Sequence, residues 1–214
     1  MEKIIKVLEQ WAAYEKTHPQ SEFEDFCRYY LARPEIRKYK PPKSPDPTPP
    51  DANGLFMMAV TRTTLAFFVY MRIALKDSPM PSIDSLMICA ALNNLGESRK
   101  TDIINHAMVE ISTGTDIINR LIKKNFLHQR VDPNDKRSKL LTLSASGKKA
   151  LFQCFARSNI AREILLTGLT EDDKKLVTQI LLPVQAKHTK LSVENKQKTI
   201  EAIRDIVVRS KDQK

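Results

Sequence analysis

A cluster of prolines near residue 40 most constrains how this chain folds. Seven prolines fall between Pro34 and Pro50, most of them within the stretch KPPKSPDPTPP. Proline donates no backbone hydrogen bond and has a fixed φ, so the stretch favours an extended polyproline II linker over a packed element. Such a stretch can also serve as a ligand for a partner domain. The sequence therefore predicts a helical arm at residues 1–33, a linker at 34–53 and a main domain from residue 54.

The composition indicates a soluble, mainly helical chain. Only five of the 214 residues are glycine, which argues against a turn-rich all-β fold and against a Gly-rich phosphate loop. Three widely spaced cysteines exclude a disulfide framework and a CxxC site. The first residues, MEKIIKVLEQW, lack the apolar core of a signal peptide. We therefore expect a cytoplasmic protein.

The arm at residues 1–33 has the pattern of two short helices and is rich in aromatic side chains. Seven of the 14 aromatic residues precede residue 40. About thirty residues are too few to bury these rings alone. We expect the arm to dock on the main domain or on a second subunit, and we find no chemistry in it.

Residues 54–75 form a long apolar stretch that is long enough to span a membrane. Arg62 and Arg72 lie within it, and each central arginine costs roughly 2.5–3.5 kcal/mol on insertion. We therefore expect a helix that is buried between elements or subunits, and no membrane partner.

The next segment predicts a helix-turn-helix followed by a β-hairpin. Ser82 and Gly96 bound a helix with Ile83, Leu86 and Met87 facing inward. Two short helices, near 100–108 and 112–125, flank a tight turn, with Ser112 as a suitable N-cap of the second. Strands at 126–131 and 139–144 then flank a polar turn that contains Pro133 and Asn134. This order is typical of a winged helix-turn-helix.

Positive charge gathers in the same segment. Residues 112–150 hold nine Lys/Arg and three Asp/Glu, and residues 187–214 hold eight and four, while the rest of the chain is balanced within a net charge of +10. Such clustering favours a polyanion as partner, although a solvated face is the alternative. The C-terminal basic stretch at 192–214 predicts an amphipathic helix whose basic side is more often solvated.

Residues 54–191 resemble the MarR family of transcriptional regulators. The most specific stretch is DPNDKRSKLLTLSASGKKAL at 132–151, which is similar to the family's wing with its Asp135 and Arg137, its Leu-Thr-Leu strand and its Gly147. The stretch RLIKKNFLHQR at 120–130 is similar to the end of the reader helix and the first wing strand. The resemblance implies a mainly α fold with a small β-hairpin wing. In it a winged helix-turn-helix domain at about 82–145 accompanies dimerisation helices at 54–75 and 146–190.

The resemblance also implies a homodimer that binds double-stranded DNA at a near-palindromic operator. A helix fits the major groove, and an arginine suits the narrow minor groove. Arg137 is therefore expected in the minor groove and Lys136 and Lys139 on phosphates. The remaining candidate DNA contacts lie on the reader helix and are Ser112, Thr113, Thr115, Asn119 and Lys123.

Three residues depart from the family pattern. Asp116 stands where a basic residue is common; it either accepts from a cytosine amino group or, as we prefer, favours the positive end of the helix. Gly114 replaces a larger residue and is expected to weaken the start of the helix. Asn125 stands where glycine commonly ends the helix, which is acceptable because Asn tolerates the left-handed conformation.

Other site types have little support in the sequence. The four histidines are dispersed, so we expect no metal and no other cofactor. Cys89 lies in an apolar pattern and is expected in the core. No catalytic triad, carboxylate pair or phosphate loop is present, so we expect no enzyme. A possible small-molecule effector would bind near Met57, Met58, Arg62 and Met71, although such residues at helical spacing are more often core or interface.

The sequence therefore predicts a transcriptional regulator, most simply a repressor relieved by a ligand. The alternative is a winged-helix protein interaction module that docks through the aromatic arm.

Overall fold

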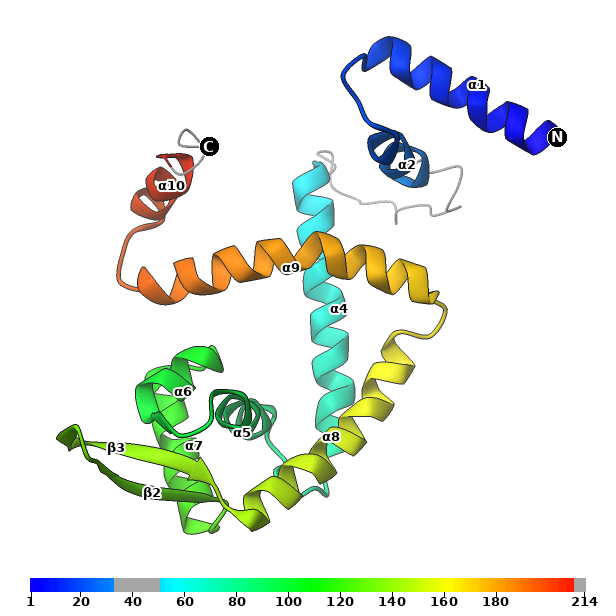
Figure 1. The fold of residues 1–214 in the computed structure, drawn as a ribbon. Helices are drawn as coiled ribbons and strands as arrows, with labels where there is room; N and C mark the ends of the chain where they lie inside the picture. Colours follow the sequence, from blue (N-terminus) through cyan, green and yellow to red (C-terminus); the bar gives the residue numbers. More distant parts are fainter. Residues whose placement is uncertain (33–50, 210–214) are drawn as a thin grey trace, which may run out of the picture. The chain divides into compact units, whose positions relative to one another are not determined.

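Helices dominate the structure, and one small sheet accompanies them (Figure 1). The computed structural model describes residues 1–32 and 51–209, and the chain divides into two compact units, residues 1–54 and 55–214. The predicted fold class, mainly α with a β-hairpin, is confirmed. Most of the predicted linker at 34–53 lies outside the described residues. Its last residues do not belong to a linker, because a helix begins at Ala52.

The first unit contains a pair of helices, α1 (Glu2–Thr17) and α2 (Phe23–Ala32). Aromatic rings join them: the Trp11 ring lies 5.2 Å from that of Phe26, and the Tyr14 ring lies 4.8 Å from that of Tyr29. Phe26 is buried, whereas Ile4, Leu8 and Phe23 remain exposed. The unit therefore has a small aromatic core and a wide apolar surface.

Helix α4 (Ala52–Leu75) is apolar around most of its circumference but buries few of its residues. Only Met71 and Leu75, near its C-terminal end, are buried. Large apolar side chains are exposed along the rest: Leu55, Phe56, Met57, Met58, Leu65, Phe68, Val69 and Ile73. Within one copy of the chain, the expected burial of this helix is therefore not found. By length and composition α4 could cross a membrane, the one such helix in the described part, but one helix of this kind is weak evidence.

Helix α5 (Ile83–Leu95) begins and ends at the predicted residues. The Ser82 hydroxyl accepts a hydrogen bond from the Ser85 N–H, and Gly96 closes the helix with φ of 72°. Leu86 is buried and Ile83 packs against the core, but Met87 is 46% exposed, so its predicted inward position is wrong.

Helices α6 (Lys100–His106) and α7 (Ile111–Lys123) form the predicted helix-turn-helix. Ile103 and Ile104 of α6 face Ile117 and Ile118 of α7 within one core cluster. The same cluster includes residues of α4, α5, the sheet and the first helix after it, so it holds the whole domain together. Its largest fully buried side chains are Leu75, Met80, Ile88, Leu92, Ile103, Ile104, Ile118, Leu127, Leu141 and Leu151.

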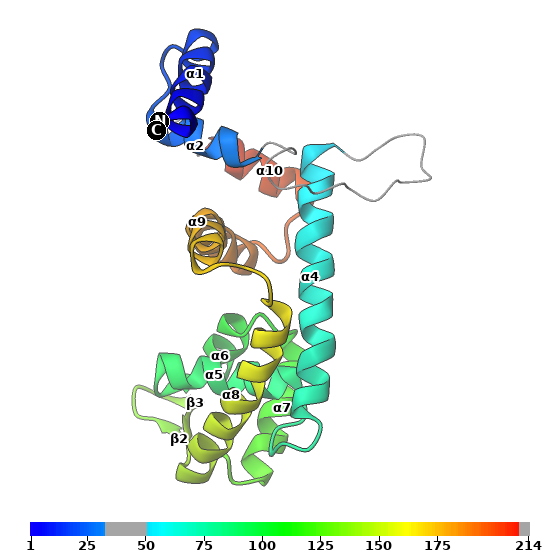
Figure 2. The ribbon, with the colours of Figure 1, turned by 90° about the vertical axis from the view of Figure 1, so that its right-hand side faces the viewer.

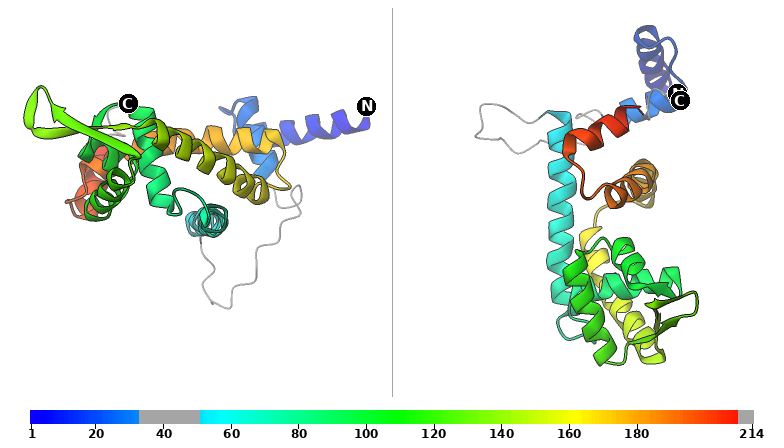
Figure 3. Two further views of the ribbon diagram at one scale, coloured as in Figure 1. Left: turned by 90° about the horizontal axis from the view of Figure 1, so that it is seen from below. Right: turned by 90° about the vertical axis from the view of Figure 1, so that its left-hand side faces the viewer.

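Three antiparallel strands form a sheet in the order β1–β3–β2. Strands β2 (Leu127–Asp132) and β3 (Asp135–Leu143) make the wing, which projects from the helices (Figure 3). Strand β3 begins four residues earlier than predicted, whereas β2 keeps the predicted length and lies one position later along the chain. Pairing of Asp132 with Asp135 leaves a short turn between them. The third strand, β1 (Ser98–Arg99), was not predicted and pairs with Leu141 and Leu140 of β3.

Three helices follow the sheet: α8 (Ala145–Leu165), α9 (Glu171–Glu194) and α10 (Ile200–Arg209). The C-terminal end of α4 lies beside α8 (Figure 2), and the Arg157 guanidinium donates to the Ala74 carbonyl. Thr170 begins α9 with a capping box that includes Asp173, as the sequence pattern indicates. Neither α9 nor α10 contains a buried residue. Both therefore lack the tertiary packing that normally supplies most helix stability.

Candidate nucleic-acid interface

Helix α7 presents a polar face opposite its buried stripe. Ile117, Ile118 and Leu121 are buried. Six side chains are exposed on the other side: Ser112, Thr113, Asp116, Asn119, Arg120 and Lys123. Of the predicted contacts on this helix, Thr115 alone is half-buried. The arrangement leaves a polar, cationic surface of the width that a major groove admits.

The N-terminus of α7 differs from the prediction. The helix begins at Ile111 with Glu110 as its N-cap, so Ser112 lies within the first turn and is not the cap. Glu110 makes no side-chain cap hydrogen bond. The first-turn N–H groups are therefore not satisfied by a cap side chain, which is typical of helix ends that meet solvent or an anion.

Gly114 allows the close approach of the two helices in the helix-turn-helix. It is buried, and a Cβ atom built on it would lie 2.7 Å from Cγ1 of Ile104 on α6. The interpretation of Gly114 as a residue that only weakens the helix start is therefore incomplete. Because Gly114 has no side chain, the reader helix α7 can lie close to α6. Asn125 ends the helix region with φ of 57°, as predicted.

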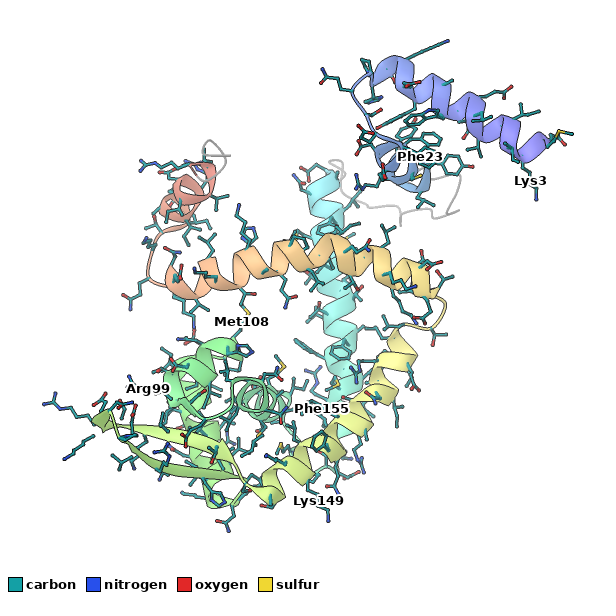
Figure 4. The ribbon with its side chains drawn as sticks, in the orientation of Figure 1. Lys3, Phe23, Arg99, Met108, Lys149 and Phe155 are labelled. Carbon is teal, nitrogen blue, oxygen red and sulfur yellow. The ribbon has the colours of Figure 1, made fainter. Side chains whose placement is uncertain are left out.

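The turn of the wing is fastened by a buried carboxylate. Nε and Nη2 of Arg99 donate to Oδ2 of Asp132 at 3.2 and 2.8 Å (Arg99 is labelled in Figure 4). Asp132 is buried and also accepts the Asn134 N–H through Oδ1 at 2.9 Å. The Asn134 N–H and the Arg99 guanidinium lower the pKa of Asp132 below its ordinary value. A charged Asp132 thus ties the turn of the wing to β1.

Two further ion pairs join the segment around β1 to the wing strands. The Arg130 guanidinium pairs with the Glu97 carboxylate, and this hydrogen bond lowers the pKa of Glu97. Asp135 accepts from the Ser138 hydroxyl at 2.7 Å and from the Arg137 N–H at 3.1 Å. Its carboxylate lies 3.8 Å from Nη2 of Arg99. The guanidinium that Asp135 approaches is therefore that of Arg99.

The cations near the wing's turn and on the reader helix have no such partner. Arg99 and Arg130 are paired with acids, whereas no ion pair in the described part of the chain includes Lys123, Lys136, Arg137 or Lys139. All four side chains are exposed. The surface formed by α7 and the wing therefore carries uncompensated positive charge.

A cleft joins the reader helix to the wing. It has a volume of about 510 Å³. Its lining residues come from α6, α7, β2 and β3 and are Lys100, Asn119, Ile122, Lys123, Gln129, Lys139 and Leu141. Three of the predicted contacts, Asn119, Lys123 and Lys139, meet here. Lys100 and Gln129 were missed by sequence reasoning, since neither lies on the reader helix or at the wing's turn.

The other predicted contacts lie outside this cleft. Ser112 and Thr113 lie in the first turn of α7, and Lys136 and Arg137 follow the turn of the wing. The predicted set thus spans two surfaces, a helix and a hairpin, with the cleft between them.

The structure places the residues predicted for an effector in different surroundings. Met71 is buried in the core, whereas Met57, Met58 and Arg62 are exposed. Residues 57 and 71 are separated by about 21 Å along an α-helix. A different cleft of about 520 Å³ lies between α4 and α8 and is lined by Tyr70, Ile73, Ala74, Arg157, Ile160, Ala161 and Ile164. A common pocket for the four residues remains a prediction.

The described residues hold no cluster of three or more His, Cys, Asp or Glu side chains suited to a metal ion. Cys89 and Cys154 are both buried in the core. Burial, and then the neighbouring Cys154, raise the pKa of the Cys89 thiol to about 12. The thiolate, which is the reactive form, is therefore disfavoured at neutral pH.

A helix-turn-helix whose second helix is flanked by a basic hairpin defines the winged helix-turn-helix class of DNA-binding domains. Residues 80–139 match the model of the MarR family. This match covers the winged helix-turn-helix part of the chain, which is therefore similar to the corresponding part of MarR-family proteins.

Two Bacillus subtilis (strain 168) proteins are similar in sequence. The uncharacterized HTH-type transcriptional regulator YwaE is 28% identical over 88 residues, which are 41% of this chain and 50% of that protein. The uncharacterized HTH-type transcriptional regulator YfiV is 27% identical over 101 residues, which are 47% of this chain and 61% of that protein. The chain thus spans about half to three fifths of the length of these relatives.

Solved structures share the fold. Bordetella bronchiseptica BpsR aligns with a TM-score of 0.57 and 17% identity, over 64% of this chain and 98% of that chain. The regulator RdhR-CbdbA1625 aligns with a TM-score of 0.57 and 17% identity, over 72% and 94%. E. coli MarR aligns with a TM-score of 0.51 and 18% identity, over 65% and 98%.

Proposed function

We propose that this protein is a cytoplasmic transcriptional regulator that binds double-stranded DNA as a homodimer. The observation that carries the proposal is the group of cations without ion-pair partners on the reader helix and wing: Lys123, Lys136, Arg137 and Lys139. Acids neutralise the neighbouring Arg99 and Arg130 but not these four. The family consists of transcriptional regulators, so we assign no catalytic activity to the chain.

The proposed DNA complex places α7 in the major groove and the wing's turn in the adjacent minor groove. Ser112, Thr113, Thr115 and Asn119 are then the candidates for base or phosphate contacts, and Arg137 enters the minor groove, where the potential is most negative. Lys123, Lys136 and Lys139 bind phosphates. Binding to a near-palindromic operator requires the two reader helices of a dimer to lie about 34–36 Å apart.

The apolar surfaces of α4, α8 and α9 support the proposal of a homodimer. Beyond those of α4, exposed apolar side chains include Phe152, Ile160 and Ile164 of α8 and Val177, Ile180, Leu182 and Val184 of α9. Exposed apolar patches of this extent are typical of association surfaces. We propose that a second copy of the chain covers them.

We further propose that the protein is a repressor released from DNA by a small aromatic effector. BpsR is described as regulated in its DNA binding by 6-hydroxynicotinic acid, and RdhR-CbdbA1625 as organohalide sensing, with 2,4-dichlorophenol bound. The cleft between α4 and α8 offers apolar walls and the Arg157 side chain to such a molecule; Met57, Met58, Arg62 and Met71 remain alternative positions. Such an effector would bind better to a dimer whose two α7 helices are not spaced to fit successive major grooves. It would therefore increase the fraction of dimers that cannot bind the operator.

Fluorescence anisotropy with the DNA upstream of the protein's own gene tests the proposal. The titration is run across a salt series with excess unrelated DNA. Specific binding that weakens steeply with salt, and that is reduced in Arg137→Ala, is the expected result. Absence of binding at low salt, with protein freed of any co-purified effector, would refute DNA binding.

One observation favours a second candidate function. The first unit exposes Ile4, Leu8 and Phe23 beside its aromatic core, which suits a winged-helix protein that docks on another protein through this arm. Apolar docking changes little with salt, whereas phosphate binding falls steeply. The salt series therefore separates the two candidates.

A further inference from the structure

The cleft between the reader helix and the wing has an unusual lining. Its inner surface includes the apolar side chains of Ile122 and Leu141, and its edges carry Lys100, Lys123 and Lys139 with the amides of Asn119 and Gln129. The lysines come from three separate elements, α6, α7 and β3. The fold thus brings three lysine side chains to the lining of one cleft.

Among the residues that the structure describes, no carboxylate lines this cleft. Within the described residues, none of its three lysines takes part in an ion pair, and the acids Glu97 and Asp132 bind Arg130 and Arg99 instead. Like charges that share a concave site repel one another unless an anion lies between them. The electrostatics of the cleft therefore favour an anionic ligand.

The pairing of the sheet shows which face of the wing borders the cleft. Gln129 pairs with Leu141, and Val131 pairs with Lys139. Because strand side chains alternate between faces, Gln129, Lys139 and Leu141 share the face that looks towards α7. Asn119 and Lys123 are four residues apart, and so they lie on one side of the reader helix.

We propose that Lys100, Lys123 and Lys139 together bind a phosphate group in this cleft. The identification of that phosphate as one of the DNA backbone rests on the proposed function. One sugar-phosphate strand separates a major groove from the adjacent minor groove. A domain with its helix in the first and its wing in the second must place that strand over the space between them. Lysine suits this ligand because its ammonium group binds phosphate as a point charge.

Lys100 is the residue that tests this inference, because it lies on neither the reader helix nor the wing. It is half-buried at the beginning of α6. A phosphate contact by Lys100 does not depend on sequence, so any mixed-sequence duplex reports on it. The same chemistry has a second source, free phosphate or a phosphorylated small molecule, which the experiment must separate from DNA.

The experiment compares wild-type protein with Lys100→Gln and with Lys187→Gln, whose lysine is exposed on α9 outside the cleft. Anisotropy is measured with a mixed-sequence duplex over a salt series. Lys100→Gln should bind about tenfold more weakly, and its slope of log K against log salt should be shallower by about 0.9, the value for one phosphate contact. Lys187→Gln should match the wild type, and thermal unfolding should show that both variants are folded.

A second measurement uses inorganic phosphate as the probe, with chloride at matched ionic strength. Phosphate-dependent NMR shifts at Lys100, Gln129 and Lys139 that disappear in Lys100→Gln would support the cleft. They would do so even for a protein that binds no DNA, which separates this inference from the proposed function. If the wild type shows these phosphate-dependent shifts but Lys100→Gln binds the duplex as tightly as the wild type, the ligand of the cleft is a free phosphate and not the DNA backbone. If the wild type binds the duplex while Lys100→Gln alters neither the salt slope nor the phosphate shifts, the inference is wrong and the proposed function stands.

Discussion

Gly147 packs directly against the Phe126 carbonyl: a Cβ atom built on Gly147 would lie 2.0 Å from that oxygen. The same carbonyl accepts the Ser144 N–H at 3.0 Å, and the Ser144 hydroxyl accepts the Gly147 N–H at 2.9 Å. The end of the reader-helix segment, the end of the wing and the start of α8 therefore meet at one crowded point.

Gly147→Ala should destabilise the domain by roughly 2–4 kcal/mol, because the added methyl group collides with backbone that cannot rotate away. Urea unfolding followed by circular dichroism measures the change. Lys148→Ala, at the exposed next residue of the same helix, should stay within about 0.5 kcal/mol of wild type. Equal stability of Gly147→Ala and wild type would show that this packing is not as tight as described.

Gly114→Ala should destabilise the helix-turn-helix by about 1–3 kcal/mol, since its Cβ atom would lie 2.7 Å from the Ile104 side chain. That neighbour is a side chain and can be shortened. In a double-mutant cycle, Ile104→Ala should therefore cost less in the Gly114→Ala background than in the wild type. Strict additivity of the two changes would contradict a contact between residues 104 and 114.

Arg137→Ala should weaken binding to the operator by roughly 1–3 kcal/mol. The loss follows from removal of the guanidinium that the proposed complex places in the minor groove, and anisotropy at moderate salt measures it. Arg204→Ala on α10 removes an equal charge far along the chain and serves as control. An unchanged affinity for Arg137→Ala would exclude the minor-groove role of the wing.

Wild-type protein should sediment at about twice the chain mass of 24.5 kDa, and Leu65→Glu should shift it towards the monomer. Leu65 is 56% exposed in the single chain, so the glutamate costs little there but is buried on association. Thr63→Glu provides the control, because residue 63 lies about 200° around the helix from residue 65. A Leu65→Glu protein that remains dimeric would place the association surface elsewhere.

The wing should loosen in acid. Hydrogen bonds from the Asn134 N–H and then from Arg99 lower the pKa of Asp132, and a hydrogen bond from Arg130 lowers that of Glu97. A carboxyl with a lowered folded-state pKa adds stability above its unfolded pKa of about 4 and loses it as the pH falls through the folded value. Amide hydrogen exchange in β2 and β3 should accelerate below about pH 4, and Asp132→Asn should remove most of that dependence. If the exchange rates in β2 and β3 follow only the intrinsic pH dependence of amide exchange, protonation of these carboxyl groups does not loosen the wing.

The order of elements could be predicted from sequence because each has a local signal. Ser82 caps a helix, Thr170 opens another, and apolar residues at helical spacing mark the buried face of α7. These signals act within a few residues along the chain. They were sufficient to predict the helix-turn-helix, the hairpin and the similarity of this part to the MarR family.

Features that depend on distant residues were not predictable in this way. Strand β1 is only two residues long, and it forms because its backbone pairs with the otherwise unpaired side of β3. The role of Gly114 depends on Ile104, ten positions away on another helix. Lys100 joins the cleft only because the fold carries α6 alongside the wing. Met87 was placed inward because its spacing fits the apolar face of α5, yet no neighbouring element covers it.

The sparse burial of α4 has a further consequence for the proposed dimer, because the order of this helix would depend on the amount of protein. Only Met71 and Leu75 are buried in this helix of 24 residues, and helices with little tertiary support are marginal in water. In a dilute, unpaired chain the first turns of α4 would open readily and become substrates for proteases. Association would close them, so order in α4 would rise with concentration by mass action. At low expression the protein would then be mostly monomeric and rapidly degraded, whereas at higher expression the protease-resistant dimer would accumulate.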